Sequence, residues 1–508
     1  MNSTQARTGL ASKAAPMPST RRVLASLALL GLAACSDGGS GGGSQNNQAA
    51  TELAAIQFWN TVAIDATGLD HMPSNQGPPH TFGEQVGPCR AARAEAIVHV
   101  AIFEVVNAIK GGYESYAGVP AATTGTSFVA GVAQAAHDTL VALWPSQSAI
   151  FDAHLTTALG AVAEGTAKTQ GIALGQNAAA AILFLRQNDG SSMGEMEYGS
   201  IGGGDPDQYN PSDAPGEWRR DPIAQQGIAL GARWGEIDTF VMEDVGQFRL
   251  PPPPALDSAE YAAAFNEVLA LGGDGTVTPT VRTQDQTHAG IYWAYDGVPS
   301  LCAPPRLFNQ IARQIAADRG TDAVGLARLL ALLNLGMADG GISCWDSKYF
   351  YKLWRPVTGV READVGTGPS GIGDGNPLTI ADPTYLPLCA PASNVNPGTN
   401  FTPPFPAYPS GHATFGGVLF QTLRRFYGTD NIAFTFVSDE YNGVTTDNTG
   451  TVRPLLPRSF ANLTEAEDEN GQSRIYLGIH WSFDASRGIQ QGNNIANYVY
   501  DHAYEPIY

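Results

Sequence analysis

Residues 409–427 read PSGHATFGGVLFQTLRRFY. This stretch combines polar residues at its start with a helical pattern of apolar residues after them. Apolar residues follow Ser410 at intervals of three and four, which is the pattern of a helix with one buried face. Serine is favoured just before a first helical turn, where its hydroxyl accepts a backbone N–H. The free N–H groups of such a turn bind anions. The stretch therefore predicts a helix over 410–427 whose start can hold an anion beside His412.

Helical spacing of apolar residues recurs along most of the chain, and only residues 434–437 have the pattern of a strand. The helical segments are 51–67, 88–109, 128–143, 151–163, 166–187, 258–271, 284–295, 305–319, 322–337 and 482–504. We expect an all-α fold of two four-helix-bundle-like halves. Residues 51–280 would form the N-terminal helical region and residues 281–508 the C-terminal helical bundle.

The composition excludes several classes of protein. The 508 residues include 48 Asp and Glu but only 28 Lys and Arg, a formal net charge of -20. Such an excess of negative charge disfavours binding to nucleic acid. Hydrophobic residues make up 43% of the chain, enough for a sizeable core. No apolar run after residue 50 reaches the ~20 residues that a membrane-spanning helix needs.

The first 50 residues have the composition of a targeting segment. Arg21 and Arg22 precede the apolar stretch 23–34, which suits a signal peptide. Residues 32–35 read LAAC and resemble a bacterial lipobox, in which Cys35 becomes the lipidated first residue. We expect a signal peptide with lipobox over 1–35, a Gly/Ser linker over 36–50, and a lipid-anchored protein of the bacterial cell envelope. Ser36 after the cysteine favours the outer membrane over a purely periplasmic location. The alternative is an ordinary export signal in which this cysteine has no role.

Four further cysteines, at positions 89, 302, 344 and 389, form no CxxC pair, so a structural zinc site is not expected. An exported protein permits disulfides, and four cysteines allow three pairings, but buried free thiols are an equal alternative. Among the histidines, His71 and His80 lie in a polar Pro-rich stretch and are interpreted as solvated. His99 and His137 lie on Ala-rich segments and are interpreted as packing residues.

Basic residues are scarce, yet three of them accompany two histidines in the C-terminal third. Residues 348–356 read KYFYKLWRP, which places Lys348 and Arg355 seven apart, two helical turns on one face. Pro356 makes Arg355 an expected helix end. Residues 473–484 read SRIYLGIHWSFD, in which Arg474 precedes His480 by six positions. Asp484 follows His480 by one helical turn.

Together with the stretch at 409–412, these segments predict a site for a tetrahedral oxyanion. Lys348, Arg355 and Arg474 supply three positive charges, and guanidinium groups match the geometry of oxyanions. The Ser410 hydroxyl and the Gly411 N–H would add hydrogen bonds. Two histidines suit two roles, one as nucleophile or metal ligand and one as proton donor or acceptor.

The series KxxxxxxRP, PSGH and SRxxxxxHxxxD resembles the signature of vanadium-dependent haloperoxidases and type-2 phosphatidic acid phosphatases, a superfamily with an all-α fold built on four-helix bundles. The resemblance implies that His480 bonds vanadium or becomes a phosphohistidine, and that His412 is the acid–base residue. It also implies that five residues bind the oxygens of vanadate or phosphate, with Lys348 stabilising the reacting oxygens: Lys348, Arg355, Ser410, Gly411 and Arg474.

The surroundings of these motifs resemble the chloroperoxidase branch. Phe405 lies seven residues before His412, and Trp345 lies three before Lys348; both match aromatic residues of that branch's halide pocket. Residues 292–297, YWAYDG, resemble the region whose aspartate, here Asp296, pairs with a site arginine. Asp484 is a second supporting candidate.

The resemblance therefore implies an enzyme that uses vanadate to oxidise chloride or bromide with hydrogen peroxide, giving hypohalous acid. An organic acceptor is a possible further partner, and contact with a membrane is expected only through the lipid anchor. Two alternatives stay open. One is an acid phosphatase that forms a phosphohistidine on the same scaffold, and the other is a non-catalytic surface protein that binds an oxyanion.

Overall fold

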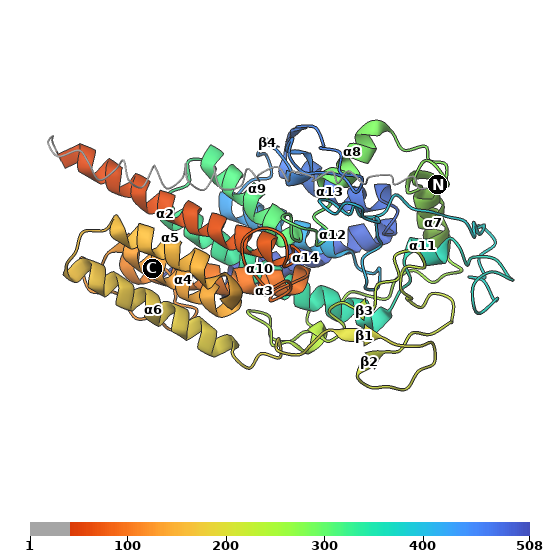
Figure 1. Ribbon diagram of the computed structural model, residues 1–508, viewed down its shortest axis with the longest axis horizontal. Coiled ribbons are helices and arrows are strands. Elements are labelled where there is room, and N and C mark those ends of the chain that lie inside the picture. The colour runs from red at the N-terminus through yellow and green to blue at the C-terminus, as the bar shows by residue number, and fades with distance from the viewer. Residues whose placement is uncertain (1–40, 508) are drawn as a thin grey trace, which may run out of the picture.

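The computed structural model describes residues 41–507, with the side chains of residues 46–507. The expected signal peptide, lipobox and first part of the linker, residues 1–40, lie outside the described residues. Most regular elements are helices, as the sequence predicts, and Figure 1 shows α2, α4, α5 and α6 toward one end of the molecule, α3 near its centre, and α7, α8 and α11 toward the other end. Helices α10 and α12 lie between these groups.

The first half of the chain contains helices that pack mainly on one another. They are α2 (Gly41–Asp70), α3 (Pro88–Lys110), α4 (Phe128–Leu143), α5 (Ser148–Gly160) and α6 (Thr166–Arg186), with the short 3-10 turns η1 (Pro145–Gln147) and η2 (Trp234–Glu236). Helix α4 packs on α3, α5 and α6. Helix α2 begins within the segment 36–50 that the sequence assigns to a linker, so residues 41–50 are helical.

The second half contains a bundle around α12. Its helices are α7 (Ala259–Leu271), α8 (Gln284–Tyr292), α9 (Pro304–Asp318), α10 (Ala323–Tyr351), α11 (Pro356–Gly359), α12 (Gly411–Tyr427), α13 (Leu463–Tyr476) and α14 (Ser482–His502), with the 3-10 turn η3 (Asp439–Tyr441). Helix α12 packs on α10, α13 and α14. Helix α7 packs on α13 and α14, so it joins this bundle although the sequence places it in the region 51–280.

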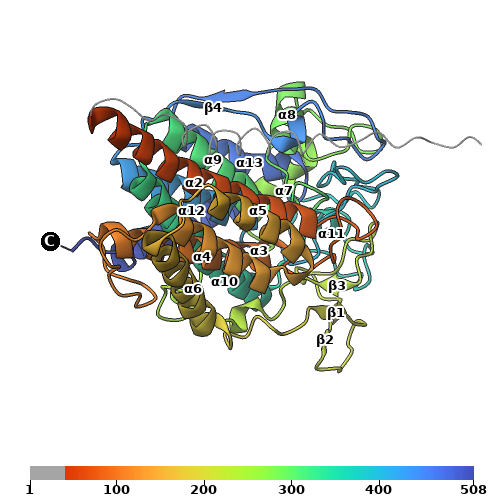
Figure 2. The same cartoon turned by 60° about the vertical axis from the view of Figure 1, so that its left-hand side comes forward.

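Strands are few and short in the described part of the chain. β1 (Met196–Tyr198) lies between β2 (Gln208–Tyr209), which is parallel to it, and β3 (Ile228–Ala229), which is antiparallel. β4 (Phe434–Phe436) and β5 (Arg458–Phe460) form an antiparallel pair, which confirms the expected strand near residue 434. Figure 2 shows β1–β3 at one edge of the molecule, away from the main body of helices.

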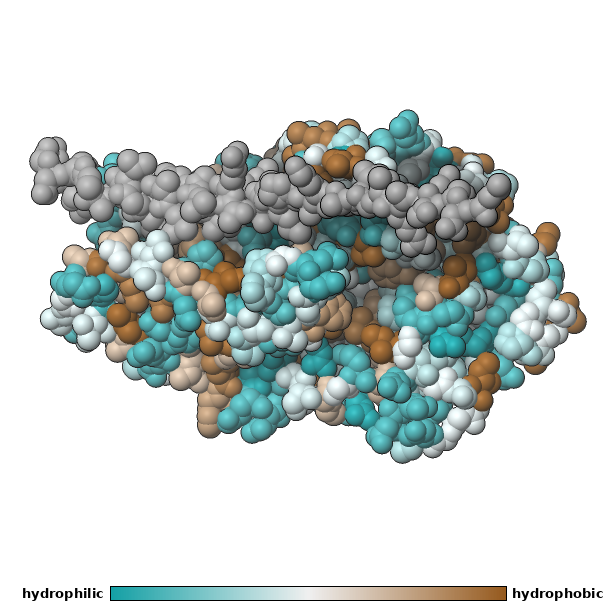
Figure 3. All heavy atoms as spheres, viewed as in Figure 1, coloured by the Kyte–Doolittle hydropathy of each residue, from teal (hydrophilic) through white to brown (hydrophobic). Residues whose placement is uncertain are grey.

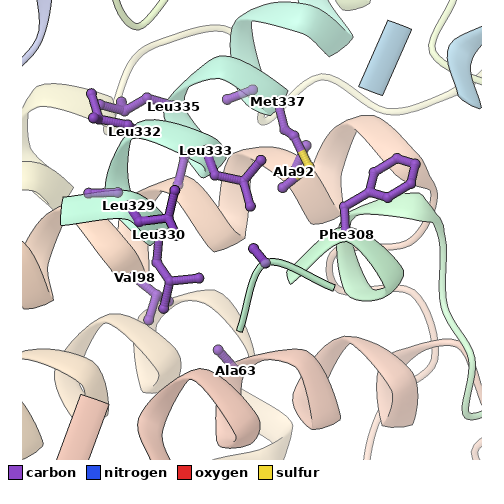
Figure 4. Close-up of a cluster of buried hydrophobic side chains, with 14 of the residues drawn as sticks. Ala63, Ala92, Val98, Phe308, Leu329, Leu330, Leu332, Leu333, Leu335 and Met337 are labelled. Atoms are coloured by element: carbon purple, nitrogen blue, oxygen red, sulfur yellow. The ribbon is translucent and has the colours of Figure 1, made fainter. Parts of the chain in front are cut away.

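Helix α10 joins the two halves because it packs on α2 and α3 as well as on α9, α12 and α14. Figure 4 shows its leucines between Ala63 of α2, Val98 of α3 and Phe308 of α9. By length and composition α10 resembles a membrane span, but 89% of its most apolar window is buried within the protein. The sequence predicts residues 322–337 and the helical turns that begin at Lys348, but not that one continuous helix joins them. The two halves therefore share one hydrophobic core.

Several large apolar side chains lie at the surface. The face shown in Figure 3 is largely hydrophilic, with apolar residues scattered among hydrophilic ones. Phe184 on α6 and Val281 before α8 are exposed examples. Single exposed apolar residues of this kind are ordinary for a folded protein and need no partner.

A candidate oxyanion site

The predicted site residues come together where α10, α12, α13 and α14 meet. Lys348 lies in the last turn of α10, and Ser410 precedes α12. Arg474 lies in the last turn of α13, and His480 in the turn before α14. Gly478 has a φ of 74° in that turn, and a Cβ there would lie 2.5 Å from the Gly272 carbonyl oxygen. The tight turn brings Arg474 and His480 to the wall of the same cavity.

Arg355 reaches the site from a loop, not from the helical face that the sequence predicts. Helix α10 ends at Tyr351, and Lys352 follows it with a φ of 50°, so Lys348 and Arg355 do not share a helix. The Arg355 guanidinium donates Nε to the Phe405 carbonyl at 2.9 Å and Nη1 to His480 Nε2 at 2.9 Å. Its buried Nη2 has no partner within the described residues. Burial lowers the pKa of this guanidinium to about 9.

Arg474 and Asp296 form a buried ion pair, as the resemblance implies. Arg474 Nη2 lies 2.6 Å from Asp296 Oδ1, and both side chains are almost fully buried. Burial raises the pKa of the Asp296 carboxyl, and the charge of Arg474 opposes that rise. The buried Nε and Nη1 of Arg474 have no partner in the described part of the chain. One side of the guanidinium is thus held by the protein, while its other N–H groups can bind a ligand.

Lys348 is completely buried at the end of α10. Its Nζ donates to the carbonyl oxygens of Pro406 and Ala407, each at 2.9 Å, and also to that of Pro409. Burial lowers the pKa of this ammonium group to about 7, with a smaller effect of the charge on Arg355. A bound anion would favour the charged form of Lys348, because opposite charges attract.

The start of α12 has the structure that the sequence predicts. The Ser410 hydroxyl accepts the Ala413 N–H, and the Ser410 N–H donates to the Asp484 carbonyl at 3.0 Å. A Cβ on Gly411 would lie 3.0 Å from the Trp345 ring, so only glycine fits here without a shift of that ring. These contacts therefore hold in place the first turn of α12, which contains His412.

His480 is held by Asp484, which confirms their contact one helical turn apart. His480 Nδ1 lies 2.8 Å from Asp484 Oδ2, which also accepts the Trp481 N–H at 3.0 Å. Burial and then the charge of Arg355 lower the pKa of His480 well below its ordinary value, so the ring is neutral. Since Nδ1 carries the proton toward the carboxylate, Nε2 presents a lone pair, as in carboxylate–histidine–metal arrangements.

His412 has the opposite arrangement of its ring nitrogens. Its Nε2 donates to the Ala294 carbonyl and lies 3.8 Å from Asp296 Oδ1. Its Nδ1 makes no hydrogen bond to the described residues. Burial, followed by the charge of Arg474, lowers the pKa of His412 well below its ordinary value. This neutral ring can accept a proton at Nδ1.

Trp345 and Phe405 are in contact, with ring centroids 4.8 Å apart at an angle of 55°. Lys348 Nζ lies 5.2 Å from the Phe405 ring centre and 5.5 Å from that of Trp345. Both rings line a cavity of about 360 Å³, whose wall also includes His412, Arg474 and His480. We refer to this cavity as the vestibule. The predicted aromatic pair thus lies directly beside the predicted oxyanion site.

Sequence reasoning missed the contribution of the N-terminal half to the vestibule. His71, Phe82 and Val86 line it, although the motifs all lie after residue 290. His71 is not solvated as expected: it is 1% exposed, and its Nε2 accepts the Gly87 N–H at 3.0 Å. His80 is also buried, with its Nε2 2.9 Å from the Met72 carbonyl oxygen. The expectation fails because Pro-rich loops also fold inward to satisfy backbone groups.

The other histidines and the cysteines take no part in the oxyanion site. His99 is buried, with its Nε2 2.9 Å from Asn60 Nδ2, and is a packing residue as predicted. His137 is largely buried as well, and its two ring nitrogens contact Asp138 and Asp152. The cysteines at positions 89, 302, 344 and 389 are all free and buried. Of the two alternatives, the structure therefore has buried free thiols and no disulfide among these four.

These groups fit vanadate or phosphate better than a metal cation. The donors that face the site are N–H groups of Arg355, Arg474 and the start of α12, and three of the guanidinium nitrogens have no partner in the described residues. No group of three or more His, Cys, Asp or Glu that could hold a cation occurs within residues 41–507. The neutral Nε2 of His480, surrounded by positive charge, suits an oxyanion such as vanadate or phosphate, which brings its own oxygen atoms.

Comparison with known proteins identifies relatives of this arrangement. Residues 328–507 match the family model described as VCPO second helical-bundle domain. The chain is 40% identical over 275 residues to vanadium chloroperoxidase of Curvularia inaequalis, an alignment that covers 47% of this chain and 43% of that protein. The chain therefore spans less than half the length of this relative.

Two solved structures share the fold. The first bacterial vanadium-dependent iodoperoxidase matches with a TM-score of 0.66 at 23% identity, over 87% of this chain and 96% of its own. The holo-type bacterial vanadium-dependent chloroperoxidase matches with a TM-score of 0.61 at 16% identity, over 84% and 94%. The chain is thus a homologue of vanadium chloroperoxidase with the fold of bacterial vanadium haloperoxidases, and residues 328–507 carry the VCPO second helical-bundle domain.

Proposed function

We propose that the protein is a vanadium-dependent haloperoxidase, which oxidises halide to hypohalous acid with hydrogen peroxide. The observation that carries this proposal is the lone pair of His480 Nε2, held by Asp484 among the buried charges of Arg355 and Arg474. Similarity to a vanadium chloroperoxidase supports the same activity.

Vanadate, when bound, would supply a Lewis acid that activates peroxide for attack by a halide. His480 Nε2 would be its protein ligand. Arg355 and Arg474 would bind its oxygens through the N–H groups that lack partners, and Ser410 and Gly411 would add donors from the start of α12. Lys348 would add a third positive charge.

His412 would accept and return protons at Nδ1 during the reaction. Its ring is neutral, and its Nε2–H is fixed by the Ala294 carbonyl, which leaves Nδ1 as the basic nitrogen. Asp296 Oδ1 lies 3.8 Å from this Nε2 and 2.6 Å from Arg474 Nη2. The Asp296 carboxylate would therefore orient the His412 ring and the Arg474 guanidinium, and keep the positive charge of Arg474 within the site.

Trp345 and Phe405 favour chloride and bromide as substrates. Their rings exclude water from the wall beside Lys348, and aromatic edges carry partial positive charge. A weakly hydrated wall suits a halide better than a hydrated phosphate ester. The net charge of -20 repels anions in general, so the buried cations must provide the local attraction.

An acid phosphatase remains the second candidate, because one specific feature suits it as well. The neutral Nε2 of His480 is a nucleophile that could accept a phosphoryl group while Asp484 stabilises the ring. The same cations would bind phosphate. We expect only weak hydrolysis of phosphate esters by the vanadium-free protein, since the apolar wall gives a phosphate ester no further partner.

The test compares two reactions of one purified preparation. We expect oxidation of bromide, and of chloride, with peroxide only after vanadate is added, and we expect preincubation with phosphate to suppress it by competition for one site. Hydrolysis of a phosphate monoester by the vanadium-free protein should be slow. Efficient ester hydrolysis without halide oxidation at saturating vanadate would assign the chain to the phosphatases, and neither activity with tight phosphate binding would indicate a binding protein.

We also propose that the protein is exported and anchored to the bacterial cell envelope by a lipid on Cys35. The support is the sequence of residues 21–44, with its arginine pair, apolar stretch, LAAC motif and Gly/Ser segment. Of these, residues 21–40 lie outside the part of the chain that the structure describes. Cys35→Ala should release the protein from the membrane fraction, because one residue carries the acyl chains. Ser36→Ala is the matched control and should stay membrane-bound. An unchanged distribution of the Cys35 variant would show that the lipobox interpretation is wrong.

A further inference from the structure

A short loop after α8 supplies protein contacts to both His412 and Arg474. The Ala294 carbonyl accepts the Nε2–H of His412. Two residues later, Asp296 Oδ1 lies 2.6 Å from Arg474 Nη2. Between them, Tyr295 has a φ of 43°, in the left-handed region that a bulky side chain rarely adopts. Such a backbone persists only where the surrounding structure holds it, so this loop needs support from outside the oxyanion site.

The 3-10 turn η3 and the end of β4 provide this support. The Tyr295 hydroxyl oxygen accepts the Asp439 N–H at 2.7 Å. The Ser438 hydroxyl donates to the Tyr292 carbonyl oxygen at 2.6 Å. The Tyr292 hydroxyl in turn donates to the Phe436 carbonyl oxygen at 3.0 Å. Three hydrogen bonds thus connect the chain around η3 to both ends of the loop.

Glu440, the middle residue of η3, is held by a buried network. Its Oε2 lies 2.5 Å from Arg453 Nη1 and accepts the Ser393 hydroxyl at 2.6 Å. Arg453 Nη1 also donates to the Ser393 hydroxyl oxygen at 2.8 Å, so the three side chains contact one another. The Glu440 side chain is 0% exposed and that of Arg453 is 8% exposed. The network therefore anchors η3 to two other loops inside the protein.

Charges on two sides act on the Glu440 carboxyl. Burial raises its pKa to about 7, and the charge of Arg453 opposes this rise, whereas the negative charge of Asp296 adds to it. A buried ion pair contributes little net stability, because removing two charges from water costs about as much free energy as their attraction returns. An ion pair placed behind the loop is better suited to fixing its geometry.

We propose that Glu440 and Arg453 are positioning residues for proton transfer at His412. Through η3 they hold the loop after α8, so that the Ala294 carbonyl keeps one proton of the ring on Nε2 and leaves Nδ1 free to accept another. Neither Glu440 nor Arg453 is among the residues that line the vestibule, so they act through the loop and not on a substrate. The inference rests on the haloperoxidase function proposed above, in which His412 is the acid–base residue.

The tautomer of His412 gives a readout that needs no turnover. We would label histidine with nitrogen-15 and record the ring signals of the vanadium-free protein by NMR, identifying those of His412 from their loss in His412→Gln. The wild type should carry the ring proton on Nε2 only. The double variant Glu440→Leu/Arg453→Met leaves no unpaired buried charge and should fold, which urea unfolding verifies. We expect this variant to show a mixture of Nε2–H and Nδ1–H tautomers.

Two further variants distinguish positioning from general stability. Glu440→Gln keeps a side-chain oxygen for both of its partners, so most His412 rings should keep the wild-type tautomer. Glu104→Gln is the matched control, because Glu104 is 1% exposed in the N-terminal half and accepts the Tyr116 N–H at 2.7 Å, far along the chain from the loop. It should keep the wild-type tautomer whatever its stability. A wild-type tautomer in the folded double variant would overturn the proposal.

Turnover separates this inference from the proposed function. At saturating vanadate, the double variant should lower kcat for bromide oxidation about ten- to a hundredfold, with little change in KM, because a positioned acid–base group contributes ~10²–10⁴-fold. A wild-type kcat despite mixed tautomers would also overturn the proposal. If the wild-type protein consumes no peroxide with bromide, the proposed function itself fails, and the tautomers still decide whether Glu440 and Arg453 position the ring.

Discussion

The His480→Ala protein is expected to bind no vanadate and to oxidise no halide. His480 Nε2 lies 2.9 Å from Arg355 Nη1 among the cations of the site, and Asp484 holds the other nitrogen of the ring. The fold should persist, because Asp484 keeps its bond to the Trp481 N–H and α14 begins after the mutated residue. Equilibrium dialysis with vanadate measures binding, and circular dichroism measures the helical content.

His502→Ala is the matched control, since His502 lies exposed at the last residue of α14, the helix that follows His480. It should keep full vanadate affinity. Arg355→Ala and Arg474→Ala should each weaken vanadate binding by roughly ten- to a hundredfold without eliminating it, because each removes one charged donor. Wild-type affinity in a folded His480→Ala protein would show that the ligand has been assigned wrongly.

Lys348→Met is expected to change both oxyanion affinity and the pH dependence of stability. Folding lowers the pKa of Lys348 from 10.5 to about 7. Between these values the unfolded chain binds one more proton than the folded protein, so the free energy of unfolding rises with pH in this window, by up to about 1.4 kcal/mol per unit. Without an ionisable group at 348 this contribution disappears.

The urea midpoints of the two proteins between pH 7.5 and 9.5 measure this difference. The urea midpoint of the wild type should increase with pH relative to that of Lys348→Met. The variant should also bind vanadate about ten- to a hundredfold more weakly. Lys352→Met, four residues away and exposed, should behave like the wild type in both measurements. Parallel midpoints for wild type and Lys348→Met would contradict a lowered pKa in the folded protein.

The sequence predicts the site more completely than the helices that hold it. Ser410 caps α12, and Asp484 contacts His480 as its spacing indicates, because both features depend on local geometry. Arg355 does not lie on the helix of Lys348, since that helix ends at Tyr351 and Lys352 has a left-handed backbone with a φ of 50°. Helix α13 was missed because its sequence, LTEAEDENGQSRIY, has few apolar residues from which a period can be recognised.

The wall of the vestibule could not be predicted, because its residues come from distant parts of the chain. Phe82 and Gln226 belong to loops before and after α3–α6, and no short motif connects them with Phe405. Helix α10 brings them together by packing on both halves. Such a wall depends on tertiary packing, whereas the PSGH motif carries its chemistry within four residues.

The buried thiols have a consequence for the lifetime of the protein during turnover. Hypohalous acids attack thiolates readily, and the four cysteines of the described chain are all buried, with pKa values that burial raises. These sulfur atoms stay protonated and out of reach of an oxidant that leaves through the vestibule. With the proposed haloperoxidase activity, a protein built in this way would resist oxidation by its own product, and it should complete many reaction cycles before that product damages it.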